Sequence, residues 1–239
     1  MDGWLDGSTA IVRPSSVERL LGAHVHEDMR WKEHIMDNEE SLMKALSKRQ
    51  GAMKKVCRVA SFKSRKMLAN GVFMSKLIYL MPVWAGCEDY LTKALQVIQN
   101  KVARSVTKKD IFTPTKVLMK EWCWLSVRQL MVYHSLIQVQ KTIQHKTPSY
   151  LYERVTSQLS LLDTSLVTRS SYYYNTRQEA RGVLRQVPEA EAKLDLSDRS
   201  WCWRATKAYH SLPLSIKMES KLPKFKKQLK AWVLGNIET

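Results

Sequence analysis

The sequence predicts a mainly α-helical protein in which a helical bundle follows a short β-hairpin. Two observations predict this fold class. After residue 28, apolar residues recur at the three- and four-residue spacing of amphipathic helices over most of the chain. Strand-like runs are confined to the first 27 residues. The chain has 239 residues, so it is long enough to bury a hydrophobic core.

The N-terminal hairpin is predicted from two apolar runs with a turn between them. Ala10–Val12 form the first run, Arg13–Ser16 have the proline and serines typical of a turn, and Val17–Val25 form the second run. His24 and His26 would share one strand face, but no third ligand lies nearby, so we expect ordinary surface histidines. Two strands alone are marginally stable, so the hairpin is expected to complete a larger sheet or to pack on the helices behind it.

A pair of helices over Lys66–Thr107 is expected to form the centre of the bundle. Pro82–Gly86 interrupt the apolar pattern, so the chain is expected to reverse there. In the second helix, polar and basic residues fall between the apolar positions, so one side can pack while another meets solvent or a phosphate backbone. The positions expected to pack are Met67, Leu68, Val72, Leu77, Ile78 and Met81 in the first helix, and Leu91, Ala94, Leu95, Ile98, Val102 and Val106 in the second.

Further helices are predicted on both sides of this central pair. A stripe of apolar residues runs through residues 42–60, and lysines and arginines fill the rest of that helix. Thr113-Pro114 and Thr147-Pro148 have the cap and first-turn proline that are typical of helix starts. The remaining predicted helices run from the cap Ser126 to His145, over Trp201–His210 and over Lys221–Leu234.

Residues 158–200 break the helical pattern and are predicted to form an irregular connection. Serine and threonine clusters fill its first half, and Tyr172–Tyr174 follow them. Exposed tyrosines beside arginines could stack on nucleic-acid bases, because every base offers a ring face. Packing of these tyrosines on the protein core is the alternative, and the residues alone favour it.

The chain is strongly basic, with 39 Lys and Arg against 22 Asp and Glu and a net charge of +17. The charge is spread over the whole chain, so we expect a polyanionic partner. RNA and DNA fit best, since phosphates attract lysine and arginine whatever the base sequence. No apolar run approaches the roughly 18 residues that span a bilayer, and the N-terminal residues lack the pattern of a signal peptide. We therefore expect an intracellular protein of the nucleus or cytoplasm, not secreted, that binds neither a membrane nor a small-molecule substrate.

No pattern in the sequence points to a metal or cofactor site. The four cysteines lie far apart and form no CxxC pair, so they are expected to be reduced, buried thiols. The adjacent acids Glu39-Glu40 and Glu88-Asp89 lie in helical or helix-starting contexts, and we expect them to be solvated or capping residues. We therefore predict no metal ligands and no cofactor.

Basic residues concentrate on two of the predicted helices that follow the hairpin. Such residues are expected to contact phosphates, and contacts of this kind carry no base information. A solvated basic face on a core helical pair is the alternative that the residues alone favour. The candidate phosphate-binding residues are Lys54, Lys55, Arg58, Lys63, Arg65, Lys66, Lys101 and Arg104.

Seven short blocks follow one another along the chain. They are Val17–Ala23 with Met29, Trp31, His34 and Ile35; Lys76–Trp84; Leu95–Arg104; Trp124–Arg128; Pro148–Leu151; Leu212–Ile216; and Phe225-Lys226 with Leu229-Lys230. In this order the blocks resemble the C-terminal part of reverse transcriptases from non-long-terminal-repeat (LINE-type, jockey-like) retrotransposons. The first block is similar to the family's "LGV, then D, L, W, HI" motif, and the later ones to its "W-L-S/P" and "N-S-L-P" motifs. The shared order over about residues 17–234 carries the resemblance.

The resemblance implies a position in the parent enzyme for each part of the chain. The primer grip, which contacts the growing strand, would contain Leu21 and Gly22. The whole chain would hold the template and primer. Its partners would be RNA, DNA and their hybrid, and the remainder of a reverse transcriptase. The implied parts are residues 1–27, a primer-grip-like β-hairpin remaining from the palm; 28–157, a helical thumb-like domain; 158–200, the irregular connection; and 201–239, a C-terminal helical segment.

The same resemblance implies that the chain does not polymerise nucleotides on its own. Reverse transcriptases use two metal ions held by aspartates, in this family a "Y/F-A-D-D" turn plus an upstream aspartate. The sequence contains no Asp-Asp pair, and the family's upstream endonuclease is missing as well. We therefore expect no catalytic residues and a nucleic-acid-binding fragment in place of an enzyme.

Other classes of function stay open. The chain departs from the family at His26, Leu80–Pro82 and His210, so a non-functional truncated retrotransposon copy is one alternative. A complete polymerase would need a palm from a separate chain. Another alternative is a helical protein-interaction module, whose binding would be insensitive to salt. Its partner-facing residues would be Trp122, Trp124, Trp201 and Trp203.

Overall fold

The N-terminal region contains two small antiparallel sheets. The computed structural model of the chain describes residues 4–5, 11–12, 15–28, 30–110, 112–167 and 200–237. In the first sheet, strand β1 (Trp4–Leu5) pairs with β2 (Ile11–Val12). In the second, β3 (Val17–Leu20) pairs with β4 (Ala23–His26), so that Val17 lies opposite His26 and Leu20 opposite Ala23.

The predicted pairing of Ala10–Val12 with Val17–Val25 is therefore wrong, although an N-terminal hairpin followed by helices is confirmed. The reason is a two-residue turn inside the segment predicted as one strand. Leu21 and Gly22 have φ angles of +50° and +79°, which reverse the chain between β3 and β4. Two residues with positive φ form the turn that matches the twist of paired strands, and glycine favours the second position.

The rest of the described chain is helical. α2, η2 and α3 follow one another without a break, and η2 is a π-helical segment within them. The helices, in chain order, are η1 (Glu33–Asp37), α1 (Leu42–Val56), α2 (Phe62–Leu68), η2 (Ala69–Met74), α3 (Ser75–Leu77), α4 (Met81–Trp84), α5 (Asp89–Thr107), α6 (Thr115–Trp122), α7 (Val127–His145), α8 (Ser149–Val167), α11 (Trp201–His210), α12 (Leu214–Lys217) and α13 (Leu222–Asn236). None of these helices is long and apolar enough to cross a membrane.

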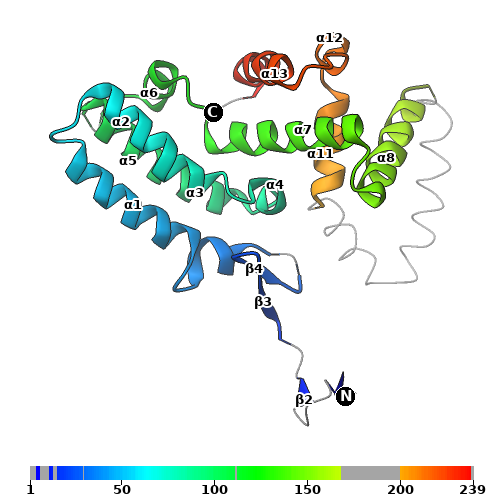
Figure 1. Cartoon of the computed structure of the whole chain (residues 1–239), viewed down its shortest axis with the longest axis horizontal. Helices are drawn as coiled ribbons and strands as arrows, with labels where there is room; N and C mark the ends of the chain where they lie inside the picture. Colours follow the sequence, from blue (N-terminus) through cyan, green and yellow to red (C-terminus); the bar gives the residue numbers. More distant parts are fainter. Residues whose placement is uncertain are drawn as a thin grey trace.

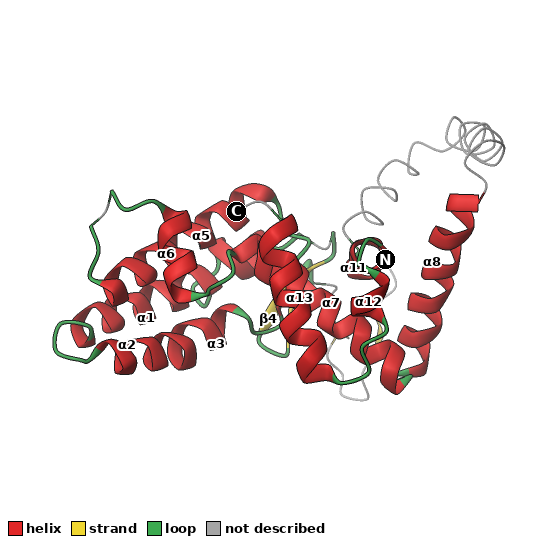
Figure 2. Cartoon of the chain, turned by 90° about the horizontal axis from the view of Figure 1, so that it is seen from above, coloured by secondary structure: helices red, strands yellow, loops and turns green. Residues whose placement is uncertain are grey.

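α7 lies at the centre of the arrangement (Figure 1). On one side, α1, the α2–α3 helix and α5 pack together, with α6 against α5. On the other side, α8 and α11 pack on α7 and on each other, and α13 runs over α7. Figure 2 shows the same division from above, with α1, α2 and α5 at one end and α8 at the other. A single connected core links these helices and includes Trp31, Leu136 and Val233.

The start of α7 follows the predicted cap. The Ser126 hydroxyl accepts a hydrogen bond from the Gln129 backbone N–H (3.3 Å), and the Gln129 side chain accepts one from the Ser126 N–H (2.9 Å). This reciprocal pair is a capping box, which satisfies backbone donors that a helix start leaves open. The prediction of a helix from Ser126 to His145 is confirmed, and this helix is buried on most sides.

The predicted helical pair is present, but it lies on one side of α7 and does not form the centre of the bundle. Its second helix buries the predicted residues. Leu91, Leu95, Ile98, Val102 and Val106 are all buried on α5, and Ala94 is half-buried. α5 therefore packs through the face that the apolar spacing predicts.

The first helix of the pair differs from the prediction. Met67 is 71% exposed and Val72 is 39% exposed, whereas Ala69 and Phe73 are fully buried. For Val72, which lies within η2, the π-helical segment is the physical reason, because each π-type turn holds an extra residue and shifts the following side chains around the helix axis. Met67 precedes η2 and lies on the exposed side of α2. The chain leaves this helix at Ile78, earlier than predicted, and Pro82 lies in the first turn of α4.

The irregular connection begins later than predicted. α8 continues as a helix to Val167, beyond the boundary at residue 158. Val155 is buried and Leu159 is half-buried at a four-residue spacing, so the helix keeps a packed side that the serine-rich composition concealed. Residues 168–199, including Tyr172–Tyr174, lie outside the described residues, so the two roles predicted for these tyrosines stay predictions.

We predict that the free energy of unfolding depends on the buried side of α5. Leu95→Ala should lower it by about 2–5 kcal/mol, because Leu95 is fully buried and its loss leaves a cavity. The control is Val97→Ala two residues later, which should change it by less than about 0.5 kcal/mol since Val97 is 52% exposed. Urea unfolding followed by circular dichroism measures both values. Equal effects of the two substitutions would contradict this packing.

Candidate nucleic-acid interface

Three helix ends that carry candidate residues meet at one end of the molecule. α1 and α5 end there and α2 begins there, and all three pack on one another (Figure 1). Lys66 is half-buried, and the other five candidates at this end are exposed. We call this surface the basic end, and its residues are Lys54, Lys55, Arg58, Lys63, Lys66 and Lys101.

The positive charge of the basic end is not neutralised by neighbouring acids. Among the described residues, none of its six cations forms an ion pair. Uncompensated cations on one surface attract a phosphate backbone over a long range. Lys54 and Lys55 also lie in the last turn of α1, where cations stabilise the partly negative helix C-terminus, so part of their role is structural.

Two of the eight candidates are engaged with the protein itself, one of them buried and the other half-buried. Arg65 is only 8% exposed, its guanidinium lies 5.7 Å from the centre of the Phe62 ring, and its Nε and Nη1 have no hydrogen-bond partner in the described chain. Arg104 is half-buried, and its Nη2 donates to the Thr113 carbonyl (3.3 Å). The structure therefore does not present Arg65 to a ligand, and it uses Arg104 to hold the segment before α6.

One exposed cation of this region was missed by the sequence analysis. Lys108 follows the end of α5 directly and is exposed, with φ +55°. Its charge, like that of Arg65, lowers the pKa of the Cys57 thiol, which burial raises above its usual value. Lys108 therefore lies near the junction of α1 and α2. In the sequence, the two adjacent lysines after the last apolar residue of α5 could have identified Lys108 as a candidate.

The primer-grip-like residues Leu21 and Gly22 form the exposed tip of the β3–β4 hairpin. Leu21 is 81% exposed, and its carbonyl accepts a hydrogen bond from the Tyr79 hydroxyl (2.8 Å). A leucine in the left-handed region costs roughly 1–2 kcal/mol, and such strain persists only where the surroundings hold it. The hydrogen bond from the Tyr79 hydroxyl helps to keep Leu21 in this conformation.

The structure does not bring the hairpin tip and the basic end together. The hairpin lies near the start of α1, and the basic end lies at its last turn (Figure 1). α1 has 15 residues, which at about 1.5 Å per residue gives a separation of roughly 22 Å along the helix. A ligand that touches both surfaces must therefore be extended.

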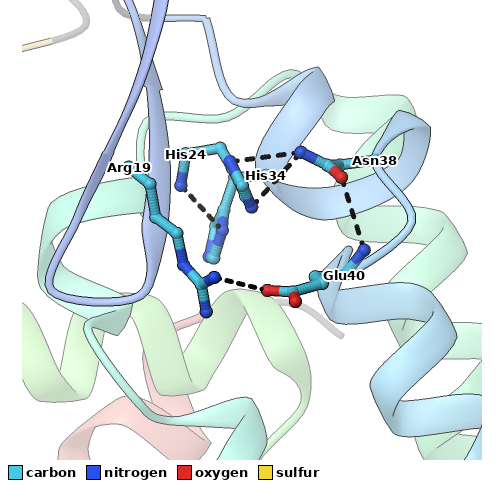
Figure 3. Close-up of polar contacts among 5 residues, drawn as sticks. All are labelled: Arg19, His24, His34, Asn38 and Glu40. Atoms are coloured by element: carbon cyan, nitrogen blue, oxygen red, sulfur yellow. Dashed lines mark hydrogen bonds and ion pairs between the residues drawn. The ribbon is translucent and has the colours of Figure 1, made fainter.

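A histidine cluster joins the hairpin to the start of α1 (Figure 3). The His24 backbone N–H donates to Nδ1 of His34 (3.4 Å), and the Asn38 side-chain amide lies 3.1 Å from Nδ1 of His24. Nearby, Arg19 on β3 pairs with Glu40 (2.8 Å). His24 is therefore half-buried and hydrogen-bonded, which corrects the expectation of a free surface histidine.

His34 is the buried member of this cluster, with 4% exposure. Burial lowers the pKa of its imidazole to about 4, with smaller contributions from the charges of His24 and Lys76. The ring is therefore neutral at pH 7, which agrees with its role as a hydrogen-bond acceptor. Within the described residues, no group of three or more metal-binding side chains comes together here or elsewhere.

The other residues considered in the sequence have structural settings. Asp89 begins α5 and pairs with Arg128 (2.9 Å), as Glu40 does with Arg19. Trp124 is 6% exposed and its indole N–H donates to the Asn70 side chain (2.9 Å), so it does not face a partner. Trp201 and Trp203 are half-buried, and the Trp122 side chain lies outside the described part.

The cysteines follow the expectation of buried thiols with one exception. Cys57 and Cys202 are buried, Cys87 is half-buried, and all four cysteines are in the reduced thiol form. Burial raises the pKa of these three thiols, which makes them less reactive. Cys123 is exposed at the end of α6, contrary to the prediction.

Comparison with known proteins adds no relative. No family model matches the chain, and no curated protein and no solved structure is significantly similar to it. The resemblance to LINE-type reverse transcriptases therefore rests on the sequence blocks alone. The function must be argued from the residues and their arrangement.

We predict that the protein loses stability as the pH falls from about 6.5 to about 4. His34 has a pKa of about 4 in the folded protein against 6.5 for an unperturbed imidazole, so the unfolded chain binds its proton more strongly. The contribution of the neutral His34 ring to the free energy of unfolding is therefore fully present above about pH 6.5. The free energy of unfolding should be lower by on the order of 2–3 kcal/mol at about pH 4. Urea unfolding at several pH values measures this slope.

The matched variants separate His34 from other titrating groups. His34→Gln should reduce the slope between pH 6.5 and 4, since the titrating group is gone. The exposed His145 at the end of α7 provides the control, and His145→Gln should keep the wild-type slope. An unchanged slope in the His34 variant would show that another group causes the pH dependence.

Proposed function

We propose that this chain is a nucleic-acid-binding fragment that holds a template–primer duplex, such as an RNA·DNA hybrid, through its phosphate backbone. The observation that carries the proposal is the basic end, where cations from three helix ends gather with no ion-pair partner among the described residues. The net charge of +17 adds a long-range attraction of the same sign.

The arrangement along α1 suits an extended duplex. The length of α1, which separates the hairpin from the basic end, is roughly 22 Å and corresponds to about six base pairs, at roughly 3.4 Å per base pair. A duplex bound there would meet Leu21 at one end and the lysines at the other. This is the order in which a primer grip and a thumb would contact template and primer, so the resemblance to reverse transcriptases supports the same proposal.

The proposed role is binding without catalysis. The two-metal mechanism of polymerases needs a pair of aspartates, and the sequence has no Asp-Asp. Any polymerising activity would therefore come from a separate palm. As proposed, the chain acts inside the cell, where its polyanionic partners are.

The protein-interaction alternative is weaker than the nucleic-acid proposal. Of its four tryptophans, Trp124 is internal and hydrogen-bonded. The two alternatives differ in how binding depends on salt, because contacts to phosphate release counterions and contacts between apolar surfaces do not.

We predict salt-sensitive binding that depends on the position of the basic residues. A labelled RNA·DNA hybrid titrated with the full chain should give a plot of log K against log salt with a slope of about −3 to −5, as expected for several phosphate contacts. Reversing Lys54, Lys55 and Arg58 to Glu should weaken binding and flatten the slope for every base sequence alike. Fluorescence anisotropy measures both quantities.

The control changes the same charge elsewhere. Lys221, Lys224 and Lys227 are exposed at and after the start of α13, and their reversal to Glu alters the net charge equally. This control should weaken binding less than the reversal at the basic end. Equal losses would show that binding follows net charge alone, and a flat salt plot of the wild-type chain would remove nucleic acid from its function.

A further inference from the structure

We propose that a groove lined by aromatic side chains binds one unpaired base of a nucleic-acid strand. This inference rests on the proposed function and adds a base-binding site to it. The groove has a volume of about 770 Å³ and lies between Trp31, the chain around α4, α8 and α11. We call it the aromatic groove, and the residues that define it here are Trp31, Val83, Gln138, Tyr150, Arg154 and Trp201.

Three aromatic rings from distant parts of the sequence line this groove. Trp31 precedes η1 and is 3% exposed, so the core holds it firmly. Trp201 is the first residue of α11 and is half-buried. Tyr150 lies in the first turn of α8 and is 72% exposed, so its ring is accessible at the groove. Stacking on the accessible rings, which are Tyr150 and part of Trp201, is open to every base, because every base has a ring face.

Polar groups in the groove match the rest of a nucleotide. Arg154 lies one turn after Tyr150 on α8, on the same side of the helix. Burial raises the pKa of the Cys202 thiol and the Arg154 charge opposes this shift, so the guanidinium lies near Cys202 in the groove lining. The Trp201 indole N–H has no hydrogen-bond partner in the described chain, so it offers a donor to a ligand. The Gln138 side-chain amide in the same lining has both a donor and an acceptor for a base edge.

The charge of the groove selects between possible ligands. No acidic side chain of the described residues lines it, and Arg154 makes no ion pair there. A purely apolar ligand would fill the groove but leave the guanidinium without a counter-charge. A nucleotide supplies both a flat ring for the aromatic residues and a phosphate for Arg154, and arginine pairs well with phosphate.

The aromatic groove is separate from the basic end. α8 and α11 lie at the opposite end of the molecule from the last turns of α1 and α5 (Figure 1). Substitutions in one surface therefore leave the other in place. The basic end would hold duplex through phosphates, and the groove would hold an unpaired base of the same strand or of a neighbouring one.

The test compares a single strand that carries bases with one that does not. Full-length protein is titrated with a labelled oligothymidine and with an abasic strand of the same length, whose phosphates are unchanged. The wild-type chain should bind oligothymidine at least about 5-fold more tightly than the abasic strand, since stacking of one base contributes that much. Tyr150→Ala should remove this preference, and Arg154→Ala should weaken binding of both strands.

A matched control removes a tyrosine outside the groove. Tyr90 is 48% exposed on α5, so Tyr90→Ala should keep the preference for bases. Circular dichroism checks that each variant is folded. Equal binding of the two strands by the wild-type chain, or a preference that survives Tyr150→Ala, would overturn the base site and leave the groove to a protein partner. Failure of the chain to bind either strand or the hybrid would instead overturn the proposed function.

Discussion

The structure depends on the burial of α7 along most of its length, because buried polar groups such as the side chains of Gln129 and Gln140 need partners inside the protein. α7 contacts α4 and α5 on one side and α8, α11 and α13 on the other. At its start, the capping box of Ser126 and Gln129 satisfies the open backbone donors. Further along, Gln140 accepts from the Tyr209 hydroxyl (2.6 Å) and donates to the Glu219 carbonyl (3.3 Å). A buried polar group without such partners is costly, so these bonds set where α11 and the segment before α13 pack on α7.

This constraint explains how the surfaces with proposed roles are held. α5 and α4 pack against α7, so the helices that end at the basic end and the chain around α4 beside the groove share one rigid support. The hairpin is attached less directly, through the cluster around His34 and the bond from Tyr79 to Leu21. Binding surfaces that lie on packed helices keep their spacing, and the hairpin tip depends on a few hydrogen bonds to keep its position.

The sequence was sufficient for the helices and insufficient for several positions that tertiary structure decides. The apolar spacing predicted the buried side of α5, and the capping pattern predicted the start of α7 at Ser126. The π-helical segment before α3 is not visible in a spacing argument, because it changes the number of residues per turn, and so Val72 was placed inside. The turn at Leu21 was also missed, since a leucine with positive φ is rare.

The candidate site shows the same limit. The basic residues near the ends of α1, α2 and α5 were identified from composition, but the burial of Arg65 follows from how those helices pack. The aromatic groove combines residues more than a hundred positions apart, such as Trp31 and Trp201. No local pattern predicts such a combination, because it requires the path of the chain between them.

The position of the last helices has a consequence for protein synthesis. Phe225, Leu229 and Val233 of α13 are fully buried, and Gln129 at the start of α7 donates to the Ile237 carbonyl (2.8 Å). The ribosome makes these residues about a hundred positions after the start of α7, so a nascent chain carries this apolar side of α7 unprotected until α13 has been made. A stop codon ahead of α11 would leave that side permanently open, and the product would be prone to aggregation and degradation. Premature termination would therefore remove the protein itself, and a shorter version with partial binding would not accumulate.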